Sequence, residues 1–160
     1  MTYEALQEMG LEERAPEVAE VMGLMARAER DLATARLLHD KDEEWCYAAA
    51  FQAMARSARA LILIEGYRPK GVRSRDTHKT VVTAAGVILG NAQKSLINKF
   101  DRMRRKYQNF MVESVSVVSH YEAGQAITDA QEFFGLASAR IRDKYSQMSL
   151  LNDSPQLVSR

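Results

Sequence analysis

The sequence has few of the residues that interrupt helices or cross-link chains. Its 160 residues include 3 prolines, 8 glycines and one cysteine, so long uninterrupted helices are favoured. Cys46 cannot form an internal disulfide, and in an alanine-rich stretch without a basic neighbour we expect a buried structural thiol rather than a reactive one. No apolar run approaches the roughly 20 residues of a membrane span, and the first residues do not resemble a signal peptide. We therefore expect a cytoplasmic protein with no membrane partner.

Motifs for common catalytic and metal chemistry are missing too. There is no glycine-rich phosphate loop, no Gly-x-Ser-x-Gly nucleophile elbow and no paired cysteine and histidine. The Glu-x-x-His pairs with which helical bundles hold metals do not occur. The 3 histidines, His39, His78 and His120, lie far apart at expected helix boundaries, where imidazole commonly caps a helix or is solvated. The sequence thus predicts no metal site, no cofactor and no clear catalytic residue.

Apolar residues recur three and four positions apart over most of the chain, the period of amphipathic helices. Expected helices cover residues 17–39, 44–65, 76–89, 92–111 and 119–148, the last beginning at the capping box Ser119-His120-Tyr121-Glu122. The second is apolar around much of its circumference and should be the central helix. It should end at Gly66, with Pro69 preventing its continuation.

The helix pattern predicts an all-α fold, an antiparallel four-helix up-and-down bundle plus one short helix. No segment alternates with a period of two well enough to predict a sheet. The chain length suits a single domain. We expect an N-terminal arm over residues 1–15, the bundle over residues 16–148 and a disordered tail over residues 149–160.

The net charge of +1 conceals a separation of charges along the chain. Residues 1–44 hold 12 acidic and 5 basic side chains, whereas residues 66–79 and 99–106 are basic. Segregated charge can steer a phosphate-bearing partner or pair two protomers. The first basic stretch, which contains Arg68, Lys70, Arg73 and Arg75, either adds to the potential of the second or is a flexible solvated loop.

The strongest local feature is the segment 99–109. At about 100° per residue, Arg102, Arg105 and Asn109 share one face, nearly opposite an apolar stripe that includes Tyr107. Guanidinium groups and an amide on this face suit phosphates and bases, while the stripe anchors the helix in the core. A solvated basic face without a ligand is the alternative. For Tyr107 we expect core packing rather than modification or catalysis.

Several segments resemble the HEPN family of nucleotide- and RNA-associated domains, in the family's own order over roughly residues 17–148. Residues 28–38 (AERDLATARLL) are similar to its opening helix. Trp45 and residues 49–61 (AAFQAMARSARAL) resemble its second helix, with Arg59 where a lysine is usual. Thr77-His78 then opens the third helix, and residues 101–106 (DRMRRK) lead into the family's functional segment.

The resemblance implies a helical bundle that dimerises. Many HEPN domains are metal-independent RNases that use Arg, four to six residues, then His, whereas others bind nucleotides or partner nucleotidyltransferases. In this chain Arg and Lys follow Arg104 and Arg105 where Asn is usual, and Tyr107-Gln108 stands where Arg-Asn is expected. The next histidine is His120, beyond the expected helix end. The RNase motif is degenerate, and the general acid or base of RNA cleavage is missing locally.

Three functions remain open. The favoured one is a nucleotide- or RNA-binding homodimer, a toxin–antitoxin component or the partner of a nucleotidyltransferase, which binds through Arg102, Arg104, Arg105 and Asn109. The second is a non-catalytic protein-interaction module in which the acidic first helix of one subunit pairs with the basic fourth helix of another. The third is a metal-independent RNase that combines Arg104 or Arg105 with His120, brought in by the loop or by a second protomer.

Overall fold

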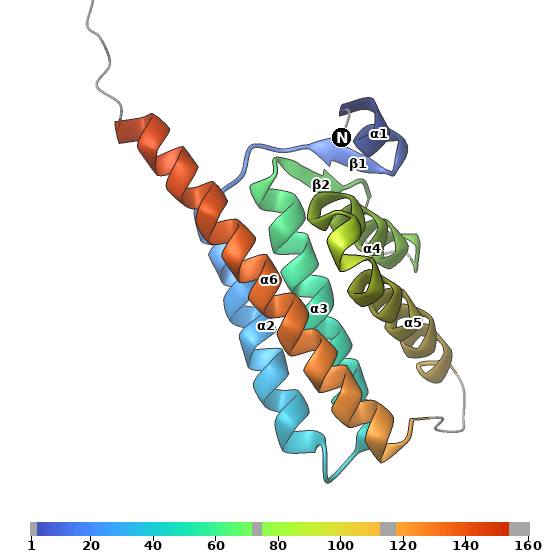
Figure 1. The fold of residues 1–160 in the computed structure, drawn as a ribbon. Helices are drawn as coiled ribbons and strands as arrows, with labels where there is room; N and C mark the ends of the chain where they lie inside the picture. Colours follow the sequence, from blue (N-terminus) through green and yellow to red (C-terminus); the bar gives the residue numbers. More distant parts are fainter. Residues whose placement is uncertain (1–2, 72–74, 113–117, 154–160) are drawn as a thin grey trace, which may run out of the picture.

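The computed structural model describes residues 3–71, 75–112 and 118–153 (Figure 1). Helices dominate this part of the chain, as predicted. In chain order the elements are α1 (Tyr3–Glu8), β1 (Leu11–Glu13), α2 (Val18–Leu38), α3 (Glu43–Ile64), β2 (Tyr67–Pro69), α4 (Arg75–Leu89), a 3-10 turn (Asn91–Gln93), α5 (Lys94–Phe110) and α6 (His120–Asp153). No described helix is both long and apolar enough to cross a membrane.

Helix α3 is the centre of the bundle, as its apolar sequence predicted. It packs against α2 and α6 on one side and against α4 and α5 on the other (Figure 1), and 15 of its 22 residues are buried. Phe51, Met54 and Leu61 of α3 are fully buried, and Phe51 lies against Phe100 of α5 with ring centroids 6.0 Å apart. Burying such side chains is the main favourable term in folding.

The helix ends follow from local chemistry. The carboxylate of Asp42 accepts a hydrogen bond of 2.9 Å from the backbone amide of Trp45 and so caps α3. Gly66 follows α3 with φ of +93°, a left-handed conformation that favours glycine. The predicted cap of α6 is confirmed on the serine side, because the Ser119 hydroxyl accepts a bond of 3.1 Å from the amide of Glu122.

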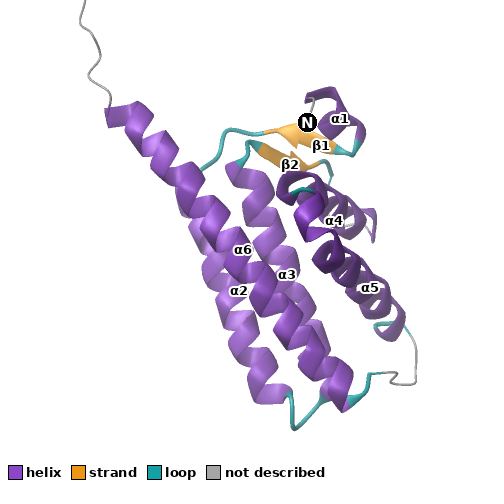
Figure 2. Ribbon diagram, viewed as in Figure 1, coloured by secondary structure: helices purple, strands orange, loops and turns teal. Residues whose placement is uncertain are grey.

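A small sheet at one end of the bundle was not predicted, and on this point the sequence analysis was wrong. Strand β1 pairs antiparallel with β2, with Leu11 opposite Pro69, Glu12 opposite Arg68 and Glu13 opposite Tyr67 (Figure 2). Three residues per strand are too few to show a period of two. Leu11 is fully buried, so residues 3–13 of the expected arm are packed on the bundle.

At the other terminus α6 extends to Asp153, so it includes the first five residues of the segment expected to be a disordered tail. The rest of that segment lies outside the described residues. In Figure 1 the C-terminal part of α6 runs beyond the ends of α2 and α3. Most of the bundle is therefore built by residues 18–141, and α6 is longer than the pattern predicted.

Candidate functional site

Helix α5 presents the predicted basic face to solvent. Arg102, Arg105 and Asn109 are exposed, while Phe100 and Met103 of the opposite stripe are buried. The segregation of charged and apolar side chains around this helix is thus confirmed. Whether the exposed face binds a ligand stays a prediction.

Ion pairs neutralise much of the charge on α5. Arg102 has no ion-pair partner among the described residues, but several of its neighbours do. The pairs join Arg104 Nε to Asp101 Oδ1 at 2.8 Å, Arg105 Nε to Asp101 Oδ2 at 3.3 Å, Lys99 Nζ to Asp129 Oδ1 at 3.6 Å, and Lys106 to Glu122. The free positive charge on this helix is consequently smaller than the sequence alone indicates.

The four predicted binding residues do not converge on one site. Arg102 lines a hollow of about 610 Å³ between α5 and α6, together with the carboxylates of Glu122 and Asp129. Arg104 has a side chain only 12% exposed, and its NH1 lies 3.4 Å from Gln108 Oε1. Since Gln108 lines a different cavity, Arg102 and Arg104 flank opposite sides of α5.

That second cavity, the arginine cleft, has a volume of about 540 Å³ and lies between α2, α3, α4 and α5. It takes its name from two arginines of α3. Its lining consists of Leu24, Gln52, Ala55, Arg56, Arg59, Thr77, His78, Tyr107, Gln108, Met111 and Val112. Both polar and apolar groups face the cleft, as in sites that bind small molecules.

The arginines differ in their partners. Arg56 pairs with Asp31 of α2, whereas Arg59 has no ion-pair or hydrogen-bond partner among the described residues. Burial lowers the pKa of Arg59, and the positive charge of Arg56 lowers it further. A guanidinium remains protonated at neutral pH in spite of such a shift. The cleft therefore holds a partly buried positive charge that no carboxylate of the described residues neutralises.

The rings of Tyr107 and His78, which line the arginine cleft, rest on Phe51, a core residue beneath the lining that we call the cleft floor. Tyr107 stacks on Phe51 with centroids 4.6 Å apart, and the His78 ring meets Phe51 edge-on at 5.2 Å. Gln52 Nε2 donates a hydrogen bond of 3.1 Å to the Tyr107 hydroxyl. The expected core packing of Tyr107 is confirmed for its ring, while its position also makes it part of the cleft lining.

His78 is the histidine of the cleft. Burial lowers its pKa below the ordinary value of 6.5, and the positive charges of Arg59 and Arg104 lower it further. Its imidazole is therefore neutral at pH 7. A phosphate beside it would oppose these effects and favour the protonated ring.

A second groove of about 280 Å³ adjoins the arginine cleft and shares Leu24, Arg59 and Thr77 with it. It brings Arg68 of the basic loop near α3 instead of near α5, and Arg68 pairs there with Glu12 at 2.5 Å. Lys70 is exposed. Arg73 and the side chain of Arg75 lie outside the described part. Among the described cations of this loop, none is seen to join the basic face of α5.

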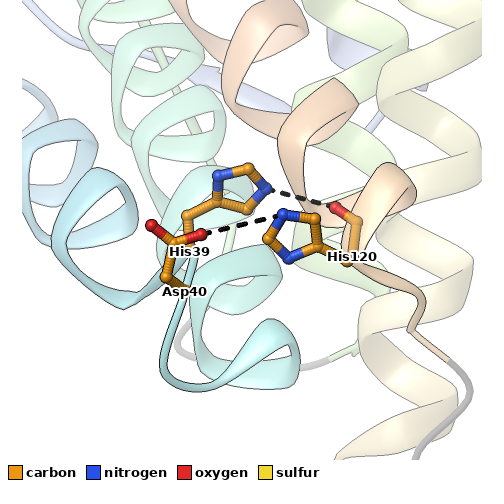
Figure 3. Close-up of side chains that lie close together, drawn as sticks. All are labelled: His39, Asp40 and His120. Carbon is orange, nitrogen blue, oxygen red and sulfur yellow. Dashed lines mark hydrogen bonds and ion pairs between the residues drawn. The ribbon is translucent and has the colours of Figure 1, made fainter.

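Two histidines that are 81 positions apart in sequence meet at the other end of the bundle, away from the sheet (Figure 3). The rings of His39 and His120 stack with centroids 4.1 Å apart. With Asp40 they form the one set of three described residues whose ligand atoms lie close enough together to share a metal ion. The sequence analysis, which considered the histidines separately, missed this cluster.

The arginine cleft was also missed, although the sequence held a signal for it. Gln52, Arg56 and Arg59 are four and three positions apart, so they form one polar stripe on an otherwise apolar helix. Such a stripe in the central helix indicates a cavity or a buried polar contact. The partner helices and His78 could not be assigned to it without the packing.

Comparison with known families gives a match over most of the chain. The family model described as HEPN domain matches residues 21–141, from the first turn of α2 to the packed part of α6. The matched span includes both the arginine cleft and the histidine cluster. Among curated proteins, no sequence matches significantly.

Proposed function

The chain belongs to the HEPN domain family, which is associated with nucleotide and RNA processing, and on this premise we propose that it binds phosphate groups of a nucleotide or RNA in the arginine cleft. The proposal rests on Arg59. A guanidinium that is partly removed from water, with no carboxylate partner among the described residues, is unfavourable until an anion pairs with it. Phosphate fits because its oxygens can accept two parallel N–H bonds from one arginine.

The remaining lining suits the other parts of such a ligand. His78 can donate to a phosphate oxygen once it is protonated, and its position beside Arg59 places both groups in one cavity. Leu24, Met111 and Val112 provide apolar surface for a base or ribose. A mononucleotide would thus contact both the cations and the apolar wall.

A longer RNA would extend from the cleft onto α5. Arg104 hydrogen-bonds to Gln108 at the cleft, and Arg105 and Asn109 lie exposed on the same helix. Arg102, which lacks an ion-pair partner among the described residues, would contact the backbone farther from the cleft. The three arginines of α5 then contribute salt-sensitive affinity, Asn109 can hydrogen-bond to a base, and Arg59 anchors one phosphate.

Binding of labelled ATP and of a short single-stranded RNA tests this assignment. Arg59→Ala should weaken binding by roughly 10- to 100-fold, because a hydrogen bond to a charged group is worth about 1.5–3 kcal/mol. Lys94→Ala removes an equal charge from an exposed position at the start of α5 and should have little effect. The double variant Arg102→Ala, Arg105→Ala should reduce RNA affinity and its salt dependence while sparing ATP.

Other results would reassign or reject the site. If Arg59→Ala binds as wild type and the double variant does not, the ligand lies on α5 and the cleft assignment is wrong. No measurable binding by wild type at low salt would reject the whole proposal. Retained folding of each variant is checked by circular dichroism.

RNA cleavage is a second candidate, because the structure places His78 and Arg59 in one cavity. A neutral imidazole can accept a proton, and a guanidinium can stabilise the charge that develops on phosphorus oxygens. Incubation of wild type and His78→Asn with RNA in the presence of a chelator tests it. Products from wild type alone would support cleavage, and no products at high protein concentration would exclude it.

We also propose that the chain forms a homodimer. We further propose that it associates with a nucleotidyltransferase-type protein or a toxin–antitoxin partner, the kinds of partner that the family suggests in general. Large apolar side chains that remain exposed support an interface, among them Met22 (56%), Leu37 (71%) and Trp45 (57%). Light scattering coupled to size exclusion measures the homodimer directly. A monomer at micromolar concentration would contradict it.

A further inference from the structure

The end of the bundle opposite the β1–β2 sheet brings together the end of α2 and the start of α6 (Figure 1), and Figure 3 shows the side chains that meet there. We propose that His39, Asp40 and His120 bind a divalent transition-metal ion such as Zn²⁺ at this end. Their ligand atoms all lie within 4.8 Å of one another. This site is separate from the arginine cleft and does not depend on the function proposed for it.

The spacing of the donors is close to that in a metal site. His120 Nε2 lies 3.7 Å from Asp40 Oδ1, which exceeds the roughly 2.7–3.2 Å of an N–H···O hydrogen bond. Two donors that are each about 2.1 Å from a tetrahedral ion lie about 3.4 Å apart. Small side-chain rotations would therefore place both atoms on one ion.

The surroundings leave one ring nitrogen of each histidine available. His39 Nε2 lies 3.2 Å from the backbone oxygen of His120. A carbonyl oxygen can only accept, so Nε2 carries the proton and Nδ1 keeps its lone pair. His120 Nδ1 lies 3.6 Å from Glu43 Oε1, and this carboxylate favours a proton on Nδ1. Its Nε2 lone pair then remains on the Asp40 side, as in carboxylate–histidine–metal arrangements.

Local charge favours a cation at this position. Residues 40–44 hold four carboxylates and one lysine, a net negative charge next to the proposed ligands. Imidazole nitrogens with one carboxylate suit Zn²⁺, Co²⁺ or Ni²⁺ better than Mg²⁺ or Ca²⁺, which prefer oxygen ligands. Three protein donors would leave a fourth position for water.

Gly124 of α6 makes room for the cluster. A Cβ atom at this position would lie 3.0 Å from His39 Nε2 and 3.2 Å from Cε1, closer than side chains normally approach. The His39 ring can therefore lie against α6 and stack on His120 at an interplanar angle of 8°. A shared ion requires the two parallel rings to tilt toward it, and solvent exposure of Asp40 leaves space for this movement.

An ion held here would join the α2–α3 turn to the start of α6. Because the donors are 81 positions apart, the unfolded chain cannot bind the ion in the same way. Because the ion then binds only the folded state, it raises the stability of the fold by an amount that grows with metal concentration. The first readout is thus thermal stability.

The experiment uses the full chain without a histidine tag, freed of metal by chelation. Adding Zn²⁺ or Co²⁺ at about 100 times the dissociation constant should raise the unfolding free energy by about 2.7 kcal/mol, which appears as a higher melting temperature. His39→Ala and His120→Ala should each abolish most of the rise. Cys46→Ala, which removes another potential metal ligand, should retain it.

Two further measurements make the outcome decisive. Bound Co²⁺ should give the visible absorption of a four-coordinate nitrogen–oxygen site, and Gly124→Ala should weaken its binding without removing a donor. A rise that persists in the His39→Ala, His120→Ala double variant would overturn the proposal. So would an equal response to Mg²⁺, or the absence of any response of the wild type to Zn²⁺, Co²⁺ and Ni²⁺.

Discussion

Two regions of this domain place histidine in opposite electrostatic surroundings. In the arginine cleft His78 lies near the positive charges of Arg59 and Arg104, which disfavour its protonation. At the α2–α3 turn His120 lies near the carboxylates of Asp40 and Glu43. The first environment selects for an anion and the second for a cation. A net charge near zero therefore conceals two regions, one whose local charge favours an anion and one whose local charge favours a cation.

The regions also differ in depth. The cleft is floored by Phe51, which is fully buried in the core, whereas Asp40 of the histidine cluster has a side chain 89% exposed. A change in the cleft floor should consequently affect the whole domain. A change in the histidine cluster should affect little beyond its own ligand.

The largest expected effect tests this difference in depth. Phe51→Ala should lower the free energy of unfolding by about 3–5 kcal/mol, because it leaves a cavity beneath the cleft. His39→Ala, without added metal, should cost less than about 1 kcal/mol, as for a partly exposed contact. Urea denaturation followed by circular dichroism measures both. Similar losses in the two variants would show that the cluster is as much a part of the core as the cleft floor.

A medium effect is expected from Asp31→Asn, which makes the cleft more positive. The variant removes the carboxylate that neutralises Arg56. It should lose about 1–2 kcal/mol of stability, since the pair is only partly exposed and a charged hydrogen bond is lost. Affinity for ATP should rise several-fold as a second free guanidinium appears. Unchanged or weaker binding by the folded variant would indicate that Arg56 does not face the ligand.

Lowering the pH should have a smaller effect, on the stability of the domain and on the phosphate affinity of the cleft, through His78. His78 has a lowered pKa in the folded state, so below pH 6.5 the unfolded chain binds more protons at this residue. Its contribution to stability is therefore present at pH 7, begins to decline below pH 6.5 and is lost as the pH falls through the lower pKa of the folded state. Phosphate affinity should change in the opposite direction, because a bound anion favours protonated His78.

Denaturation and ATP titrations between pH 5 and pH 8, with a chelator present, measure both trends. The matched control is His78→Asn, which has no titrating group at this position. Its stability should depend less steeply on pH than that of the wild type. Identical slopes for the two proteins would contradict the assigned role of burial and of the neighbouring arginines.

The smallest effect should come from Arg105→Ala on the exposed face of α5. Arg105 is 60% exposed in its pair with Asp101, and surface pairs of this kind contribute little to stability. The unfolding free energy should change by less than about 0.5 kcal/mol. RNA affinity should fall only modestly, more at low salt than at high salt. A loss as large as that of Arg59→Ala would move the main phosphate contact from the cleft to α5.

Sequence periodicity was sufficient to predict the helices and the central position of α3, because every turn of an amphipathic helix repeats the same pattern of apolar and polar residues. It could not predict features that involve only a few residues or residues far apart in the sequence. Strand β1 has three residues, and His39 and His120 meet only through tertiary packing. Arg59 was noted as a departure from the family pattern, yet its exposure to a cavity depends on which helices surround α3.

The small sheet has a consequence for the order in which the chain folds. Helices α2 and α3 are consecutive and can pack as soon as both have been made, whereas the Glu12–Arg68 pair joins residues 56 positions apart. Closing so long a loop costs more entropy and is slower than local pairing. We expect the β1–β2 contact to form after the helical hairpin and to open before it during unfolding. The backbone amides that exchange most slowly with solvent should therefore lie in α3, and those of strands β1 and β2 should exchange faster.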